Sequence, residues 1–254
     1  MKFVVIGGDA AGMSAASKAK RNKPDLEVIT VEASQDVSYS ACGMPYNIAE
    51  PERKMDDLIV RNAEVFRSKQ GIDLRLGHKA VSIDRSNKKI ICEVEGNGKA
   101  EISYDKLLIA AGARPIRPEL PGIDLPGVMA LKSLEDGRAI KQFLGEKTVK
   151  KVLIVGMGYI GLEMAEAFHA RGAEVTMVKP GQRLLAFMPE EMAELVKQEL
   201  SNKGVQCFPG VAVNSLHDDG AGIKVCLSSG DIQVDLVLVS VGITPNSELA
   251  AGAA

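Results

Sequence analysis

The sequence lacks the features that mark disulfide-rich, zinc-binding, nucleic-acid-binding and membrane-spanning proteins. Its cysteines are only Cys42, Cys92, Cys207 and Cys226, which lie far apart and without the spacing of a disulfide framework or a zinc site. The net charge of −2 gives no overall attraction to nucleic acid or to an acidic membrane. No apolar run approaches about 18 residues, so we expect no membrane-spanning helix. No signal peptide precedes the first apolar stretch, and a cytoplasmic location is therefore predicted.

What is present is typical of a globular protein. The 254 residues are 46% hydrophobic and 25% charged. A chain of this length can bury a proper core in one large or two medium-sized domains.

One cysteine stands out by its surroundings. Cys42 lies in the stretch VSYSACGMPY, with no second cysteine at CxxC or CxxxxC spacing. A lone cysteine is more often an inert core residue. Ser-Ala-Cys-Gly is poor material for an apolar core, however, and Gly43 lets a cofactor or the backbone approach closely. Pro45 then fixes the exit of the loop. We therefore expect a redox-active thiol that exchanges electrons with bound nucleotides.

A glycine-rich loop, GGDAAG, begins at Gly7 between a predicted strand and a predicted helix over 11–21. Gly7 allows the tight turn and Gly12 allows the helix to pack closely on the strand, so that the helix N-terminus faces a pyrophosphate. Asp9 takes the place of the middle glycine of the GxGxxG pattern. Glu32 supports this interpretation of the motif. It ends the next predicted strand, at the position where a carboxylate binds ribose hydroxyls in dinucleotide-binding units.

A complete GxGxxG motif lies at Gly156–Gly161, before a predicted helix over 160–171. The next predicted strand, over 174–178, ends at Lys179 rather than at a carboxylate. An ammonium attracts a 2′-phosphate that a carboxylate would repel. The sequence thus predicts that NADPH is accepted at least as well as NADH, with Arg183 as a second cation. The alternative is a lysine that points to solvent in a site that takes both cofactors.

The rest of the chain is read from its apolar periodicity. A helix is predicted over 56–69, stopped by Gly71, and another over 189–203. The first half of the chain has a predicted antiparallel meander over 73–76, 79–83, 89–94 and 101–104 and a buried strand over 106–111. Further strands are predicted over 206–208, 212–216, 224–227 and 236–241. The proline-rich crossover over 115–126 is the best candidate for a domain boundary. Two nucleotide-binding units, each with its own meander, indicate two bound nucleotides.

On these motifs the chain resembles the flavoprotein disulfide reductases that have two dinucleotide-binding domains. Within them it is similar to the single-cysteine branch of coenzyme A-disulfide reductase, NADH-dependent persulfide reductase, and NADH oxidase and peroxidase. The resemblance rests on the stretches 7–16, 40–46, 110–115, 156–163 and 242–246. It implies an α/β fold with two Rossmann-like domains of three-layer ββα form. The implied domains are 1–113 for FAD, 114–243 for NAD(P), and 244–254 as the start of a return to the FAD-binding domain.

The resemblance also implies roles for residues. FAD would bind in the first unit and NADH or NADPH in the second, with hydride passing from nicotinamide to flavin. Electrons would then reach Cys42, the catalytic residue, which cycles as thiol and mixed disulfide or sulfenate. The implied FAD-binding residues are Gly7, Gly8, Ala11, Gly12, Glu32, Ala33, Ala80, Val81, Ala110, Gly112 and Arg114. The implied NAD(P)-binding residues are Gly156, Gly158, Tyr159, Ile160, Gly161, Glu163, Lys179 and Gly242. No metal is expected.

Basic residues on the first helix of coenzyme A-disulfide reductases meet the nucleotide end of coenzyme A. The corresponding substrate-binding residues here would be Lys18, Arg21, Ser38, Tyr39 and Arg61. A solvated basic face is the alternative for the cations among them.

The chain departs from the family pattern in two ways. The oxidase and peroxidase members carry a histidine in the first nucleotide loop, where this chain has Ala10. Because a peroxide reaction benefits from a nearby acid–base group, its absence favours a low-molecular-weight disulfide or persulfide, such as coenzyme A disulfide, as substrate. The alternatives are an NADH oxidase or peroxidase that uses a Cys42 sulfenate, and a non-catalytic nucleotide-binding redox module. Family members also continue into a second FAD-contacting segment and a dimerisation domain. We therefore expect a C-terminally truncated chain that holds FAD poorly, with the homodimer of the full-length family uncertain.

Overall fold

The computed structural model describes residues 1–96 and 98–253. By its internal contacts the chain divides into two compact units. Unit 1 comprises Met1–Ser40, Asp56–Arg114 and the residues from Pro245 on, and unit 2 comprises Ala41–Met55 and Pro115–Thr244. The predicted domain boundaries after residues 113 and 243 remain predictions.

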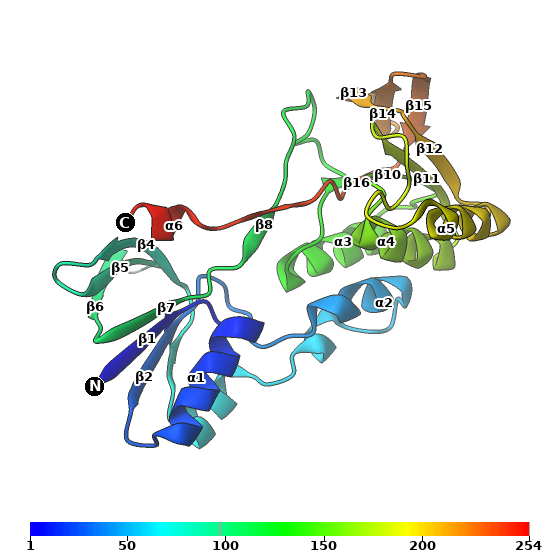
Figure 1. Ribbon diagram of the computed structural model, residues 1–254. Helices are drawn as coiled ribbons and strands as arrows, with labels where there is room; N and C mark the ends of the chain where they lie inside the picture. The colour runs from blue at the N-terminus through cyan, green and yellow to red at the C-terminus, as the bar shows by residue number, and fades with distance from the viewer. Residues whose placement is uncertain (97, 254) are drawn as a thin grey trace. The chain divides into compact units, whose positions relative to one another are not determined.

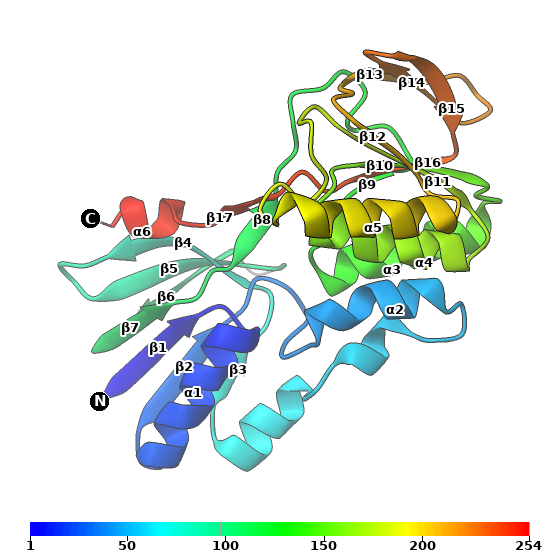
Figure 2. The same cartoon turned by 45° about the vertical axis from the view of Figure 1, so that its right-hand side comes forward.

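Unit 1 has a parallel sheet of strand order β3-β2-β1-β7 (Figure 1; β3 is labelled in Figure 2). Its elements are β1 (Lys2–Ile6), α1 (Ala10–Asn22), β2 (Glu27–Val31), β3 (Asp73–Arg75), β7 (Lys106–Ile109) and α6 (Glu248–Ala251). A three-stranded antiparallel meander, β4 (His78–Asp84), β5 (Lys89–Val94) and β6 (Gly98–Ser103), forms a second layer. The order of these elements follows the sequence prediction for the first nucleotide-binding unit.

The alternation of side chains along β1 fixes the layers of unit 1. Val5 packs with Ala16 of α1 on one face of the sheet. Val4 and Ile6 pack on the other face, against the meander, whose buried residues include Cys92. Successive side chains of a strand point to opposite faces, so one apolar strand contributes to both cores.

Unit 2 repeats this plan around a five-stranded parallel sheet of order β12-β11-β10-β16-β9 (Figure 2). Its strands are β9 (Val128–Met129), β10 (Lys151–Val155), β11 (Glu174–Lys179), β12 (Gln206–Pro209) and β16 (Leu236–Val239). Its helices are α2 (Met44–Ala49), α3 (Leu134–Glu146), α4 (Tyr159–Ala170) and α5 (Glu190–Asn202). The meander β13 (Val213–Asp218), β14 (Ile223–Leu227) and β15 (Gly230–Val234) covers Val155, Val178 and Val239 on one face of the sheet. The predicted α/β fold is confirmed.

The chain passes between the units along β8 (Ala113–Pro115) and β17 (Ile243–Pro245), which pair as a two-stranded sheet. No helix among residues 1–96 and 98–253 combines the length and the apolar composition needed to cross a bilayer.

The predicted helix over 56–69 is wrong. The structure has a 3₁₀ turn at Met55–Leu58 and a π-helical turn at Val65–Lys69, with irregular chain between them. The backbone there bonds to a distant segment instead: Val60 donates to the Ser38 carbonyl at 2.9 Å. Tertiary hydrogen bonds have therefore replaced the local helical ones.

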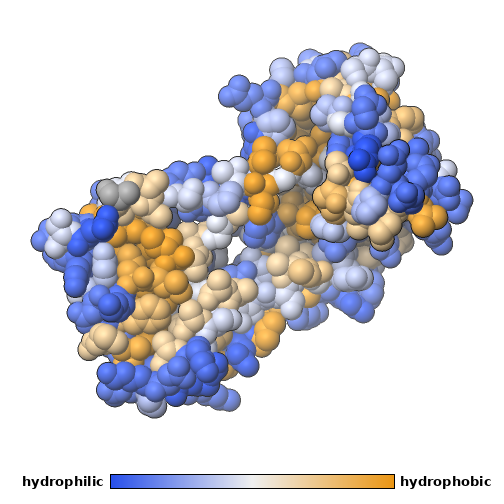
Figure 3. Space-filling view, in the orientation of Figure 1, coloured by the Kyte–Doolittle hydropathy of each residue, from blue (hydrophilic) through white to orange (hydrophobic). Residues whose placement is uncertain are grey.

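Two strand predictions also need correction. The segment predicted over 73–76 is not part of the meander, because β3 pairs in parallel with β2. The strand predicted as buried over 106–111 is β7, the edge strand of the described sheet, with Ile109 37% exposed. Figure 3, in the orientation of Figure 1, shows apolar side chains gathered over β7 on the face of unit 1 that is turned toward the viewer. The sequence prediction missed α3, α6, β8, β9, β15 and β17.

Candidate functional site

Cys42 lies in a short 3₁₀ turn, Ala41–Gly43, directly before helix α2. Its side chain is exposed, whereas those of the other cysteines are buried or half-buried. Pro45 lies in the first turn of α2, where its missing N–H removes no helical hydrogen bond. The thiol predicted to be catalytic is thus the most accessible one in the chain.

The segment that follows Cys42 is fixed within unit 2 by the Lys141 ammonium of α3. This ammonium donates to four backbone carbonyls, those of Asn47, Glu50, Pro51 and Arg53. The first three lie at 2.7, 2.8 and 3.0 Å. Arg171, just after α4, donates to the Ile48 carbonyl at 3.3 Å. Side chains far along the sequence therefore hold the segment behind the cysteine.

Two of the remaining thiols are kept protonated by their surroundings. Burial raises the pKa of the Cys92 thiol on β5 to about 11, and burial likewise raises the pKa of the Cys207 thiol on β12 to about 11. The thiolate is the nucleophilic form of cysteine. Near neutral pH, Cys92 and Cys207 are therefore poor nucleophiles.

The loop between β1 and α1 requires glycine at two positions. Gly7 has φ +110°, and a Cβ there would lie 2.1 Å from the Ala110 carbonyl oxygen. A Cβ on Gly12 would lie 1.8 Å from the Gly7 carbonyl oxygen. Because both positions lack side chains, α1 begins close against β1, and its first N–H groups lie at the carboxyl edge of the sheet.

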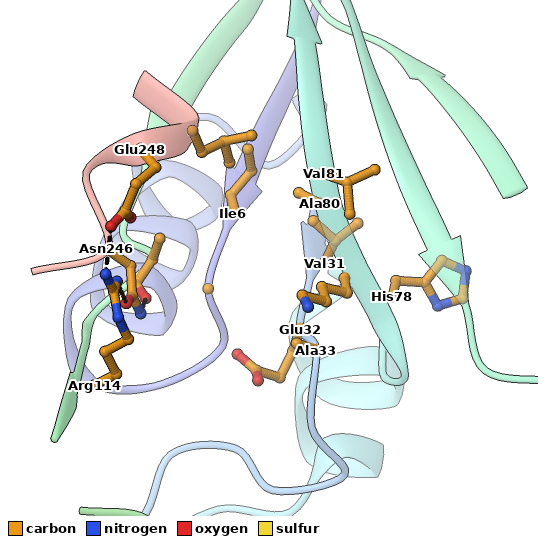
Figure 4. A pocket seen from close by; sticks show the side chains of 14 residues that line it. Ile6, Val31, Glu32, Ala33, His78, Ala80, Val81, Arg114, Asn246 and Glu248 are labelled. Atoms are coloured by element: carbon orange, nitrogen blue, oxygen red, sulfur yellow. Dashed lines mark hydrogen bonds and ion pairs between the residues drawn. The ribbon is translucent and has the colours of Figure 1, made fainter. Parts of the chain in front are cut away.

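A cavity of about 570 Å³ opens at this edge within unit 1 (Figure 4). It is lined by Ile6, Gly7, Val31, Glu32, Ala33, His78, Lys79, Ala80, Val81, Ala111, Arg114, Asn246, Glu248 and Leu249. The predicted FAD-binding residues among them are Gly7, Glu32, Ala33, Ala80, Val81 and Arg114. The structure thus brings together residues that the sequence placed in four separate stretches.

Glu32 is held in place by three hydrogen bonds. Its Oε2 accepts from the Gly8 N–H at 2.7 Å. Its Oε1 accepts from the N–H and the hydroxyl of Ser34, each at 2.8 Å. The carboxylate therefore ties the glycine-rich loop to the end of β2, at the position that binds ribose hydroxyls in dinucleotide-binding units.

Arg114 forms a polar cluster with Asn246 and Glu248 that the sequence prediction missed (Figure 4). Its guanidinium donates to Asn246 Oδ1 at 3.0 Å and to Glu248 Oε1 at 2.6 Å. The hydrogen bond from Arg114 lowers the pKa of the Glu248 carboxyl. Asn246 ends one of the stretches that carry the family resemblance, so that motif was a usable signal. Glu248 and His78 have no comparable signal in the sequence.

The other residues predicted to bind FAD do not line this cavity; they are Gly8, Ala11, Gly12, Ala110 and Gly112. Gly8 and Gly12 act through the loop, one by its hydrogen bond to Glu32 and the other by close packing. A glycine-rich loop, a fixed carboxylate and a cavity of this size fit the adenosine and pyrophosphate part of FAD. The roles of the individual residues remain predictions.

Unit 2 has a second cavity, of about 580 Å³, at the matching edge of its sheet. It is lined by Pro115, Leu131, Gly156, Met157, Gly158, Tyr159, Ile160, Lys179, Pro180, Ala186, Phe187, Val239, Ser240, Val241, Gly242 and Ile243. A Cβ added at Gly158 would meet no atom within 4 Å, so a ligand can approach the backbone there. This open space fits a dinucleotide pyrophosphate.

Most of the residues predicted to bind NAD(P) lie in this cavity: Gly156, Gly158, Tyr159, Ile160, Lys179 and Gly242. Gly161 does not line it, but a Cβ there would lie 2.7 Å from the Gly156 carbonyl oxygen, so it allows α4 to pack closely. Glu163 also lies outside the lining. Its predicted contact with the nicotinamide amide remains a prediction.

Tyr159 has an aromatic neighbour that the sequence prediction missed. The rings of Tyr159 and Phe187 have centroids 4.6 Å apart at an interplanar angle of 46°. Both side chains are more than half exposed, at 59% and 58%, and both line the cavity. The loop that carries Phe187 is tied to the glycine-rich loop, because the Leu185 N–H donates to the Met157 carbonyl at 3.2 Å.

A smaller cavity in unit 1, of about 190 Å³, contains part of the predicted substrate site. It is lined by Ala10, Met13, Ser14, Ser17, Arg21, Ser38, Arg61 and Phe66. Arg21, Ser38 and Arg61 are therefore brought together, whereas Lys18 and Tyr39 lie outside the lining. Neither guanidinium forms an ion pair with a described residue, so both can bind an anion.

Comparison with known proteins shows what this arrangement resembles. A family model described as pyridine nucleotide-disulphide oxidoreductase matches residues 1–254. The chain is 33% identical over 251 residues to a protein of Methanocaldococcus jannaschii named NADH oxidase, covering 98% of this chain and 56% of that protein. It is 37% identical over 250 residues to the NAD(P)H coenzyme A polysulfide/persulfide reductase of Pyrococcus horikoshii, covering 98% of this chain and 55% of that protein.

The solved structures give the same picture. The NAD-dependent persulfide reductase from A. fulgidus matches with a TM-score of 0.94 and 36% identity, over 100% of this chain and 48% of that one. The predicted family resemblance is confirmed. The chain spans about half the length of the curated relatives that it matches.

Proposed function

Because the chain belongs to the pyridine nucleotide-disulphide oxidoreductase family, we propose that it carries the nucleotide-binding and redox part of an FAD-dependent NAD(P)H oxidoreductase. Its substrate is a low-molecular-weight disulfide or persulfide, reduced through Cys42. One observation carries the proposal: a single chain has two cavities, each at a glycine-rich loop after a parallel strand, and one exposed cysteine.

Each cavity has its own binding groups in this proposal. Glu32 and the Gly7 loop hold the adenosine and pyrophosphate of FAD, and the Gly156–Gly161 loop holds NAD(P)H. FAD, when bound, supplies the chemistry that converts a two-electron hydride donor into a reductant of sulfur. Tyr159 and Phe187 form an aromatic wall that limits where a ring of the dinucleotide can lie.

Cys42 is the group that meets the substrate. Its thiolate attacks one sulfur of the disulfide RSSR, so that a Cys42–SR mixed disulfide forms and one RS⁻ leaves as thiol after taking up a proton. Two electrons from NAD(P)H then reduce the mixed disulfide, which releases the second thiol and restores the thiolate. The sum is NAD(P)H + H⁺ + RSSR → NAD(P)⁺ + 2 RSH. With a persulfide RSSH, the products are RSH and hydrogen sulfide.

The cavity at Arg21, Ser38 and Arg61 supports a substrate that carries phosphate. Two guanidinium groups and the hydroxyls of Ser14, Ser17 and Ser38 surround a space that fits a small anion. Coenzyme A disulfide and coenzyme A persulfide both carry phosphates at a distance from their sulfur atoms. A coenzyme A derivative is therefore the proposed substrate.

A second function, reduction of oxygen, is favoured by one finding. The relative from Methanocaldococcus jannaschii is named an NADH oxidase. Against it stands Ala10, where the resemblance leads us to expect a histidine in oxidase and peroxidase members.

The test is reduction by the purified chain with FAD in excess. NADPH or NADH added without oxygen should bleach the flavin, and coenzyme A disulfide should restore the colour with release of two thiols. Parallel assays replace the disulfide with persulfide, oxygen or peroxide, and these assays separate the two functions. Cys42→Ser should retain flavin reduction and lose disulfide reduction, whereas Cys226→Ser, at a half-buried thiol, should retain both. A chain that binds neither FAD nor NAD(P)H would refute the proposal.

A further inference from the structure

The two nucleotide-binding units differ in charge at one equivalent position. In unit 1, Ile6 pairs with Val31, the last residue of β2, and the next residue is Glu32. In unit 2, Val155 pairs with Val178, and the next residue along β11 is Lys179. Glu32 and Lys179 therefore occupy equivalent positions, each one residue beyond the last residue pair between two parallel strands, β1 and β2 in unit 1 and β10 and β11 in unit 2.

The backbone hydrogen bonds confirm that the two positions correspond. The Gly7 N–H donates to the Val31 carbonyl at 2.9 Å, and the Gly156 N–H donates to the Val178 carbonyl at 2.8 Å. In dinucleotide-binding units, a carboxylate at this place binds the 2′-hydroxyl of the adenosine ribose, whereas a cation accommodates a 2′-phosphate. Unit 2 has the cation.

We propose that the end of β11 and the turn that follows it, from Lys179 to Arg183, bind the 2′-phosphate of NADPH. This inference rests on the proposed function, in which the cavity of unit 2 holds a nicotinamide dinucleotide. Lys179 is the one charged residue in the described lining of that cavity, so no carboxylate there opposes a phosphate. Lys179 also forms no ion pair with any described residue.

The turn is built so that the Lys179 ammonium lies over its backbone. A Cβ added at Gly181 would lie 3.0 Å from Lys179 Cε and 3.4 Å from Nζ, so the lysine chain curls across the glycine. The Gly181 carbonyl accepts from the Gly210 N–H at 3.0 Å, which anchors the turn to the end of β12. The Lys179 ammonium therefore lies beside an anchored turn at the edge of the cavity.

Arg183 supplies the second positive charge of the turn, although it lies outside the described lining of the cavity. One of its nitrogens donates to the Met188 carbonyl at 2.8 Å, which leaves other N–H groups of the guanidinium for an anion. The side chain is exposed, so Arg183 adds to the attraction while Lys179 carries most of the selectivity. A partly exposed pair of a phosphate and an ammonium changes affinity by roughly tenfold to thirtyfold.

The experiment compares two adenine nucleotides that differ only in this phosphate. Isothermal titration of the whole chain with 2′,5′-ADP and with 5′-AMP should give a Kd about tenfold lower for 2′,5′-ADP. The same preference should appear for NADPH over NADH. Lys179→Met should bring the two Kd values together, and Lys179→Glu should reverse their order. The preference should also shrink as salt is raised, because the phosphate contact is electrostatic.

A matched control is Lys203→Met, which removes a positive charge from the same unit at an exposed lysine paired with Glu199. It should leave both Kd values unchanged. Equal binding of both nucleotides by the wild-type chain, or an unchanged ratio in Lys179→Met, would overturn the phosphate site and leave the proposed function standing. Binding of neither nucleotide would overturn both.

Discussion

Replacing Lys141 with methionine tests whether one side chain holds the segment behind the exposed cysteine. Methionine keeps most of the apolar stem and removes the ammonium. An ammonium has three N–H groups, and here they are shared by the carbonyls of Asn47, Glu50, Pro51 and Arg53. A hydrogen bond from a charged donor contributes about 1.5–3 kcal/mol to stability.

Adding the contributions of all four hydrogen bonds would overstate the loss of stability. Glu50, Pro51 and Arg53 are exposed, so water can replace the lysine ammonium at their carbonyl oxygens. Asn47 is buried, and its carbonyl loses its partner with less compensation. We therefore expect Lys141→Met to lower the free energy of unfolding by about 2–3 kcal/mol. That is a large part of the roughly 5–15 kcal/mol typical of a domain.

The assay is urea unfolding followed by circular dichroism, together with the rate at which Cys42 reacts with a thiol reagent in native buffer. The rate should rise because the loosened segment samples more conformations. Lys203→Met serves as the control, since its exposed pair with Glu199 at 3.7 Å contributes at most about 1 kcal/mol. Unfolding free energies of the two variants within about 0.5 kcal/mol of each other would refute the reasoning.

Three further predictions follow from the site. Cys42→Ser should bind FAD like the wild type and should release no thiol from coenzyme A disulfide, as measured by a thiol-specific dye. At pH 8, alkylation followed by peptide mass spectrometry should find Cys42 labelled and Cys92 and Cys207 unlabelled. Burial raises the pKa of Cys92 and of Cys207 from 9.0 to about 11, so the free energy of unfolding should fall as the pH rises above 9, where these thiols ionise in the unfolded chain. Gly7→Ala should lower the free energy of unfolding, measured by urea unfolding, by about 3 kcal/mol or more, because its Cβ would lie 2.1 Å from the Ala110 carbonyl oxygen. Gly204 also has a positive φ but has open space around it, so Gly204→Ala should lower the same free energy by about 1 kcal/mol.

The parts of the fold that the sequence predicted well are those with local causes. The strand over 151–155 and the helix that follows it are marked by an apolar run, a glycine turn and a second glycine. The helix α3 was missed although it has a local signal, because Ser133 and Asp136 form a capping box at its start.

Other features have causes that no local pattern contains. Residues 56–69 have helical spacing, yet the backbone near Val60 bonds to Ser38. Ala41–Met55 groups with unit 2, where its backbone accepts a hydrogen bond from Lys141, which lies about a hundred residues further along the chain. In the same way, Glu248 lines the first cavity and forms an ion pair with Arg114, 134 residues earlier in the chain. Such long-range contacts are set by tertiary packing and therefore escape prediction from periodicity.

Packing decides which of the four thiols is accessible. Cys92 is buried completely between the meander and the sheet, so it serves as a small apolar side chain. Cys207 sits half-buried on β12, where burial again favours the neutral form. Cys42, by contrast, lies in a turn of small residues that cannot enclose it, and the segment behind it is held by Lys141. Exposure makes the thiol reachable and anchoring keeps it in one place, and a reaction between two sulfur atoms needs both.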